Sequence, residues 1–139
     1  MNQTAIFWPM LGHVLLVFIV YVVLAIRRGG AVKSGEIKVN QFKGRMEEPS
    51  SSMTAANNIL NQFEAPVLFH ICCICLYVTA GSSILTVTLA WLFVIARYVH
   101  AYVHLTSNKI KWRNQSFRLG LLFLAVLWIV FALHLAGLV

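Results

Sequence analysis

The chain has 139 residues, of which 60% are hydrophobic and only 11% are charged. This length suits one domain, residues 1–139, and so apolar a composition excludes an ordinary soluble globular protein. The net charge of +7 does not indicate nucleic-acid binding, because the basic residues lie beside apolar segments. We therefore predict an all-α integral membrane protein, an up-and-down bundle of four transmembrane helices with membrane lipids as partners and no nucleic acid.

Four apolar segments are each about as long as the ~20 residues that a membrane-crossing helix needs. They cover residues 5–26, 53–79, 84–105 and 115–138. The first segment has no basic stretch before it, and Arg27 and Arg28 follow it directly. We therefore interpret it as a retained helix and not as a cleaved signal peptide.

The basic residues predict the orientation in the membrane. All Lys and Arg residues except Arg97 lie in or just beyond two connecting segments, 27–52 and 106–114. Cytoplasmic loops carry an excess of Lys and Arg, so we expect both segments on the cytoplasmic side. Both termini and the uncharged turn 81–83 then lie outside.

The second apolar segment begins with a polar face. Asn57, Asn61 and Glu64 stand at positions i, i+4 and i+7, which a helix places on one side. A carboxylate within a membrane is unfavourable unless it is paired, and it indicates a functional site. Because Pro66 follows so closely, we also expect a kink or local distortion near Glu64.

The third apolar segment carries a matching basic face. Arg97, His100 and His104 stand at i, i+3 and i+7. Counted from the turn 81–83 at ~1.5 Å per residue, Glu64 and Arg97 lie at depths of roughly 24 and 20 Å. We therefore predict an ion pair between Glu64 and Arg97. We also predict a cytoplasm-facing cavity for an anionic small molecule, with a polar plug that only fixes helix register as the alternative.

Other polar residues in the apolar segments indicate packing. Cys72, Cys73 and Cys75 form an odd cluster without a CxxC pair, so neither a disulfide framework nor a metal site is predicted. His13 is interpreted as a packing or interfacial residue. A small proton-coupled exporter would also use a membrane Glu, but it would leave that Glu free to titrate, which the predicted partner Arg97 argues against.

Two stretches resemble a known family, the membrane-associated proteins in eicosanoid and glutathione metabolism (MAPEG). Residues 61–69, Asn-Gln-Phe-Glu-Ala-Pro-Val-Leu-Phe, resemble its second-helix motif. Residues 97–100, Arg-Tyr-Val-His, followed by His104, Asn108 and Arg113, are similar to its third helix and following loop. The likeness covers about residues 54–125 and is to bacterial-type members, so we expect a bacterial inner membrane.

The resemblance implies a homotrimer that binds glutathione as cosubstrate at subunit interfaces, in cavities facing the cytoplasm. By motif position, Asn61 and Glu64 correspond to glutathione contacts, and Arg97 and His100 hold matching places on the third helix. Arg113 falls where the eicosanoid-processing enzymes carry the Arg proposed to activate the thiol. The candidate glutathione site is Asn57, Asn61, Glu64, Arg97, His100 and His104, with Arg113 as the candidate catalytic residue.

The chain departs from the enzymes of the family at four positions. Asn57 and Leu60 replace Arg residues, and His104 and Phe117 replace Tyr residues. Fewer cations weaken the grip on carboxylates, because Arg provides bidentate contacts that Asn cannot. Two functions therefore stay open: a glutathione-dependent transferase or peroxidase acting on lipophilic electrophiles, and a non-catalytic binding or scaffold protein of the same fold.

Overall fold

The computed structural model describes residues 2–43 and 48–138, and the regular secondary structure within these residues is helical, without strands. The elements are a 3₁₀ helix η1 (Gln3–Ile6), α1 (Phe7–Lys33), a 3₁₀ helix η2 (Val39–Lys43), α2 (Ser50–Gln62), α3 (Ala65–Val78), α4 (Ile84–Leu105) and α5 (Ile110–Leu135). The all-α fold class predicted from the sequence is confirmed. Arg45, part of the predicted basic segment 27–52, lies outside the described residues.

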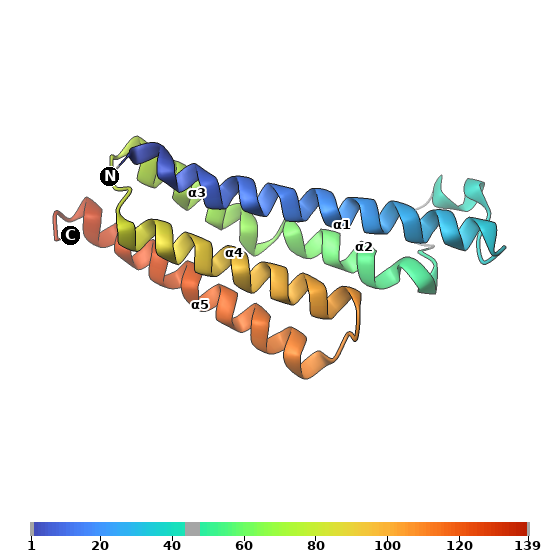
Figure 1. The fold of residues 1–139 in the computed structure, drawn as a ribbon. Coiled ribbons are helices and arrows are strands. Elements are labelled where there is room, and N and C mark those ends of the chain that lie inside the picture. The colour runs from blue at the N-terminus through green and yellow to red at the C-terminus, as the bar shows by residue number, and fades with distance from the viewer. Residues whose placement is uncertain (1, 44–47, 139) are drawn as a thin grey trace.

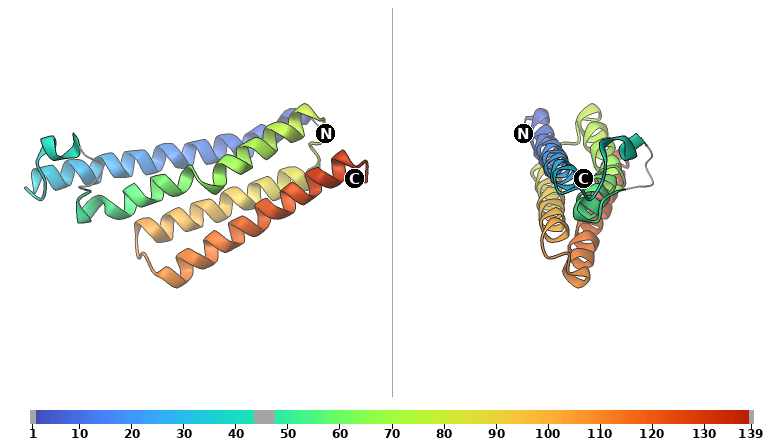
Figure 2. Two further views of the ribbon diagram at one scale, coloured as in Figure 1. Left: turned by 180° about the vertical axis from the view of Figure 1, so that it is seen from behind. Right: turned by 90° about the vertical axis from the view of Figure 1, so that its right-hand side faces the viewer.

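Four stretches are long and apolar enough to cross a membrane: Gln3–Lys33, Ser50–Val78, Ile84–Leu105 and Ile110–Leu135. They form an up-and-down bundle in which α1 packs beside α2 and α4, and α5 packs beside α4 and α3 (Figures 1 and 2). Both ends of the chain and the turn after α3 lie at one end of the bundle (Figure 1). The chain is thus a multi-pass integral membrane protein, as predicted.

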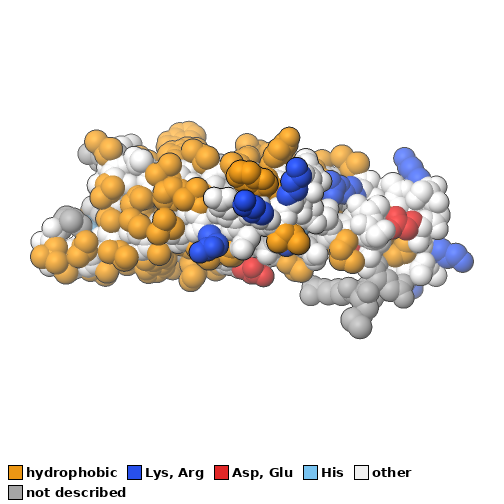
Figure 3. Space-filling view, turned by 90° about the horizontal axis from the view of Figure 1, so that it is seen from below, with side chains coloured by type: hydrophobic (Ala, Val, Ile, Leu, Met, Phe, Trp, Pro, Cys, Tyr) orange, Lys and Arg blue, Asp and Glu red, His pale blue; other side chains and the backbone are white. Residues whose placement is uncertain are grey.

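The two ends of the bundle also differ in the side chains on their surface. Figure 3 shows hydrophobic side chains spread over the end that carries the termini, whereas Lys and Arg side chains gather over the other part of the bundle. At that other end α1 and α2 project beyond the connection between α4 and α5 (Figure 1). We call this the basic end.

The helix ends differ from the predicted ones except in α4, which has the expected range 84–105. The first helix continues to Lys33 instead of stopping at 26, and α5 begins at Ile110 instead of 115. The connecting segments 27–52 and 106–114 are therefore shorter than predicted. Charged residues mark where a chain leaves the lipid, but backbone hydrogen bonds can continue a helix into water.

The core consists of two clusters of buried apolar side chains. The larger lies towards the terminal end, where the rings of Phe69 and Phe93 stack with centroids 4.5 Å apart. Cys72 and Cys73 are buried in this cluster, as expected of packing residues. The smaller cluster joins α1, α2 and α4 nearer the basic end through Leu16, Val20, Leu24, Ala55, Ile59 and Ala101.

The second membrane span is broken between α2 and α3. Glu64 occupies the break with φ −95° and ψ −107°. Pro66 has no N–H group to donate to the carbonyl of Gln62, four residues earlier, so it cannot continue the hydrogen-bond ladder of the preceding helix. At the break, the carbonyl of Asn61 accepts from Nη2 of Arg97, at 2.9 Å. The distortion predicted near Glu64 is confirmed, and it places a polar backbone group at the centre of the bundle.

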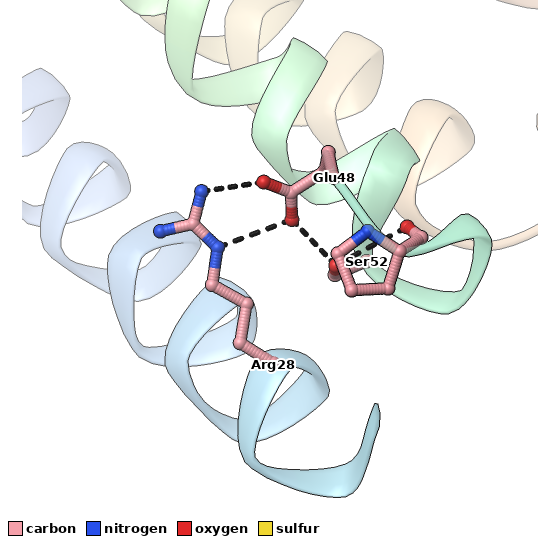
Figure 4. A network of polar contacts seen from close by, with 4 residues as sticks. Arg28, Glu48 and Ser52 are labelled. Atoms are coloured by element: carbon pink, nitrogen blue, oxygen red, sulfur yellow. Dashed lines mark hydrogen bonds and ion pairs between the residues drawn. The ribbon is translucent and has the colours of Figure 1, made fainter. Parts of the chain in front are cut away.

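At the basic end, an ion pair joins α1 to the residues just before α2. Nη2 of Arg28 lies 2.6 Å from Oε2 of Glu48, and Nε of Arg28 donates to Oε1 at 3.1 Å (Figure 4). The hydroxyl of Ser52, in the first turn of α2, also donates to Glu48. One carboxylate thereby connects the end of α1 to the start of α2.

This pair predicts a pH-dependent contribution to stability. The Arg28 hydrogen bond, helped by Ser52, holds the pKa of Glu48 below its ordinary value. A depressed pKa stabilises the fold above the unfolded value of about 4.3, and this contribution is lost as the pH falls through the folded pKa. Because Arg28 is 42% exposed, Glu48→Gln should lower stability at neutral pH by less than about 1 kcal/mol. In thermal unfolding, the difference from wild type should shrink on acidification; a difference that persisted at about pH 3 would contradict this assignment.

Candidate functional site

A pocket with a volume of about 460 Å³ opens between α2 and α5, with α4 at its back. Its lining residues are Asn57, Leu60, Asn61, Glu64, His100, His104, Ile110, Arg113, Asn114 and Phe117. The pocket therefore contains every site residue predicted from the sequence except Arg97. It lies in the half of the bundle next to the basic end.

The α2 wall of the pocket has the predicted face. Asn57 and Asn61, four residues apart on α2, line the cavity together with Glu64 just beyond the end of that helix. Glu64 lies at the helix break, and its side chain is exposed. Leu60 interrupts the polar face and is also exposed.

Arg97 lies behind the pocket and is only 2% exposed. Its Nη2 donates to the Asn61 carbonyl at 2.9 Å and to Oε1 of Gln62 at 3.4 Å. It forms no ion pair with Glu64, so that prediction is wrong. The predicted depth was right, since Arg97 reaches the turn just before Glu64 and the two charges still interact electrostatically. The guanidinium is drawn instead to the carbonyl that the helix break leaves without an amide partner.

The two α4 histidines have different partners. Nδ1 of His100 lies 3.0 Å from the carbonyl oxygen of Arg113, which can only accept, so this nitrogen donates. Nε2 of His100 is buried, and no described residue is its partner. Nδ1 of His104 lies 3.3 Å from Nδ2 of Asn58. The two rings lie 5.7 Å apart and together form the back of the pocket.

Arg113 is held in place at the α5 wall. Its Nη1 donates to Oδ1 of Asn108 at 2.8 Å. Asn108 lies in the turn before α5 with φ of +45°, a left-handed conformation that Asn tolerates better than most residues. Arg113 and Glu64 thus bring one cation and one anion to the same cavity, which suits a ligand that carries both charges.

A buried polar network, which the sequence pattern did not predict, lies beside the pocket. Oε1 of Gln62 lies 3.1 Å from Nε2 of His13, and Nε2 of Gln62 donates to Oδ1 of Asn58 at 2.8 Å. Nδ1 of His13 lies 3.1 Å from Nε2 of His70. A signal was present, because Asn58 and Gln62 stand at i and i+4 in the same span, on the face next to Asn57 and Asn61. Polar residues within a membrane segment rarely lack partners.

The fold and this pocket define a four-helix integral membrane protein with a charged cavity beside a broken second span. The MAPEG family model matches residues 5–133, and the chain belongs to the MAPEG family. No curated protein and no solved structure shows a significant match. The family resemblance recognised at residues 61–69 and 97–100 is therefore confirmed.

The predicted Glu64–Arg97 ion pair was also the reason for setting aside a proton-coupled exporter. These two side chains do not form that pair, so this reason no longer holds.

Proposed function

We propose that this MAPEG protein is a glutathione-dependent transferase or peroxidase acting on lipophilic electrophiles. The observation that carries the proposal is the shared cavity, in which Glu64 and Arg113 are joined by amide and imidazole side chains. Glutathione presents one ammonium group, two carboxylates and a thiol. A volume of about 460 Å³ lies within the usual range of small-molecule sites.

In the proposed complex, Glu64 pairs with the ammonium group, and Asn57, Asn61 and His104 donate to carboxylates. Arg113 lies near the thiol. A cysteine thiol has a pKa near ~8.5, and an adjacent guanidinium lowers it, which raises the thiolate fraction at neutral pH. The thiolate sulfur then forms a bond to the electrophilic carbon, the leaving group departs with its electron pair, and the thiol proton goes to solvent.

The proposal includes a homotrimer, with each site completed by a neighbouring subunit. The pocket is open on one side in the single chain, and the apolar side chains of Leu60 and Ile110 at its edge are exposed. A neighbouring subunit would cover them. The basic end is assigned to the cytoplasm of a bacterial inner membrane, so the pocket admits glutathione from that side. The lipophilic second substrate enters through the lipid.

A non-catalytic binding or scaffold protein is the second candidate. It is favoured by Asn57 and Leu60, which line the pocket at the positions where enzymes of the family carry Arg. Phe117 also lines it and offers no hydroxyl. With Arg113 as the one cation among the lining residues, the pocket has fewer groups to hold two carboxylates and still polarise a thiol.

Calorimetric titration of the purified protein with reduced glutathione tests the proposal. We expect a dissociation constant below about 1 mM, together with transfer of the thiol to 1-chloro-2,4-dinitrobenzene. N-acetylated glutathione is the matched control, and without its ammonium group it should bind at least about tenfold more weakly, because it loses the pairing with Glu64. Binding without transfer would favour the non-catalytic candidate. If the protein showed no binding and no transfer, both candidate functions would be contradicted, and only the family assignment would remain.

A further inference from the structure

We propose that buried hydrogen bonds fix His104 as a neutral imidazole with its proton on Nε2. The polar pocket then always presents an N–H donor to its ligand at this position. Gln62 and Asn58 do not line this pocket. They are positioning residues, which set the tautomer of His104 through their hydrogen bonds.

Arg97 fixes the orientation of the Gln62 amide, because its guanidinium has donors and no acceptor. Its Nη2 lies 3.4 Å from the Gln62 side-chain oxygen. The reverse amide orientation would set donor against donor, so the oxygen must face Arg97 and the nitrogen must face away. That nitrogen donates to Oδ1 of Asn58 at 2.8 Å. Gln62 is 2% exposed and Asn58 is fully buried, so water does not relax these orientations.

The orientation of the Asn58 amide fixes the protonation of His104. Since Oδ1 of Asn58 accepts from Gln62, Nδ2 of Asn58 is the atom that faces Nδ1 of His104, at 3.3 Å. A ring nitrogen that faces an amide donor must accept, and it therefore carries no proton. His104 is consequently not an imidazolium, and its single ring proton lies on Nε2.

The network is consistent on the other side of Gln62. The Gln62 oxygen can only accept, so Nε2 of His13 donates to it. When the His13 ring is neutral, its Nδ1 accepts from Nε2 of His70. Every donor therefore points the same way, from His70 at one end to His104 at the other. His100 differs, because its Nδ1 carries a proton that it donates to the carbonyl of Arg113. The back of the pocket thus combines one histidine whose Nδ1 accepts with one whose Nδ1 donates.

Gln62→Glu is the sharpest test, because it replaces one NH₂ group by oxygen with little change in shape. A carboxylate cannot donate to Asn58, so the Asn58 amide should turn and present its oxygen to Nδ1 of His104. His104 must then carry its proton on Nδ1. The adjacent Arg97 compensates the new charge. Spectra that correlate ring ¹⁵N with ring ¹H nuclei in histidine-labelled full-length protein report each tautomer directly, with His104 assigned from a His104→Gln spectrum.

We expect wild-type His104 to be protonated on Nε2 and the Gln62→Glu variant to be protonated on Nδ1. Gln115→Glu, the same exchange at an exposed position of α5, should leave His104 unchanged. If Gln62→Glu does not fold, Asn58→Leu removes the donor and should let the Nδ1-protonated form appear. A wild-type His104 protonated on Nδ1 or on both nitrogens, or a tautomer unaffected by either variant, would overturn the proposal.

The binding consequence rests on the proposed function. If His104 donates to a glutathione carboxylate, Gln62→Glu should weaken glutathione binding about tenfold, because an acceptor then faces an anion. An unchanged affinity would overturn the role of His104 as a ligand donor. The spectra need no ligand, so a wild type that fails to bind glutathione counts against the proposed function and not against the tautomer.

Discussion

Replacing Arg97 with leucine is expected to lower the free energy of unfolding by about 3 kcal/mol. The guanidinium supplies the hydrogen bond that the Asn61 carbonyl loses at the break between α2 and α3. Leucine fills the space but cannot donate, so this carbonyl loses its hydrogen-bond partner beside the buried position of residue 97. Gln62 keeps His13 as a donor, so the carbonyl accounts for most of the loss.

Two further variants separate this role from a simple effect of charge. Arg97→Lys retains one donor, so it should recover part of the stability. Glu64→Gln should lower the free energy of unfolding by less than about 1 kcal/mol, because the exposed carboxylate forms no ion pair with Arg97. Unfolding in mixed micelles titrated with SDS measures all three. If Glu64→Gln proved as damaging as Arg97→Leu, the two charges would have to be paired in the folded protein after all.

For Arg97, the sequence could predict the depth in the membrane but not the hydrogen-bond partner. Counting residues along antiparallel helices placed Arg97 and Glu64 at one level, because helical rise is nearly constant. Helical spacing likewise predicted one shared face for Asn57, Asn61 and Glu64. All three line the pocket, although Glu64 lies just beyond the end of α2. The partner of Arg97 could not be predicted in this way. That partner is the Asn61 carbonyl, which lies at the break between α2 and α3, and a carbonyl is present at every residue.

The buried network was harder to predict for a related reason. Asn58 and Gln62 adjoin Asn57 and Asn61 in the sequence, and which pair faces the cavity depends on how α2 rotates against α1 and α4. His13 lies far away in the sequence, on α1, and only packing brings its ring to Gln62. The helix ends at Lys33 and Ile110 were missed because charge marks the edge of the lipid and not the end of a helix.

Arg113→Ala is expected to lower the rate of thiol transfer about 100-fold while glutathione still binds. Under the proposed function, Arg113 is the cation that stabilises the thiolate, and the remaining ligand contacts come from α2, from α4 and from Glu64 at the break between α2 and α3. Without it, the thiol should titrate nearer its ordinary pKa of ~8.5, so the rate at saturating glutathione should rise to its plateau at a higher pH than in wild type. This shift distinguishes a lost cation from a merely distorted pocket.

Arg118→Ala provides the matched control for this experiment. Arg118 is an exposed cation further along α5 and does not line the pocket, so its removal changes the net charge equally and should leave transfer and its pH profile unchanged. Arg113→Lys keeps a positive charge but loses the guanidinium that donates through Nη1 to Asn108, and an intermediate rate is expected. Equal losses in Arg113→Ala and Arg118→Ala would show that general surface charge governs the rate. An unchanged pH profile in Arg113→Ala would remove Arg113 from the thiol chemistry, because a guanidinium that stabilises a thiolate must change where that thiol titrates.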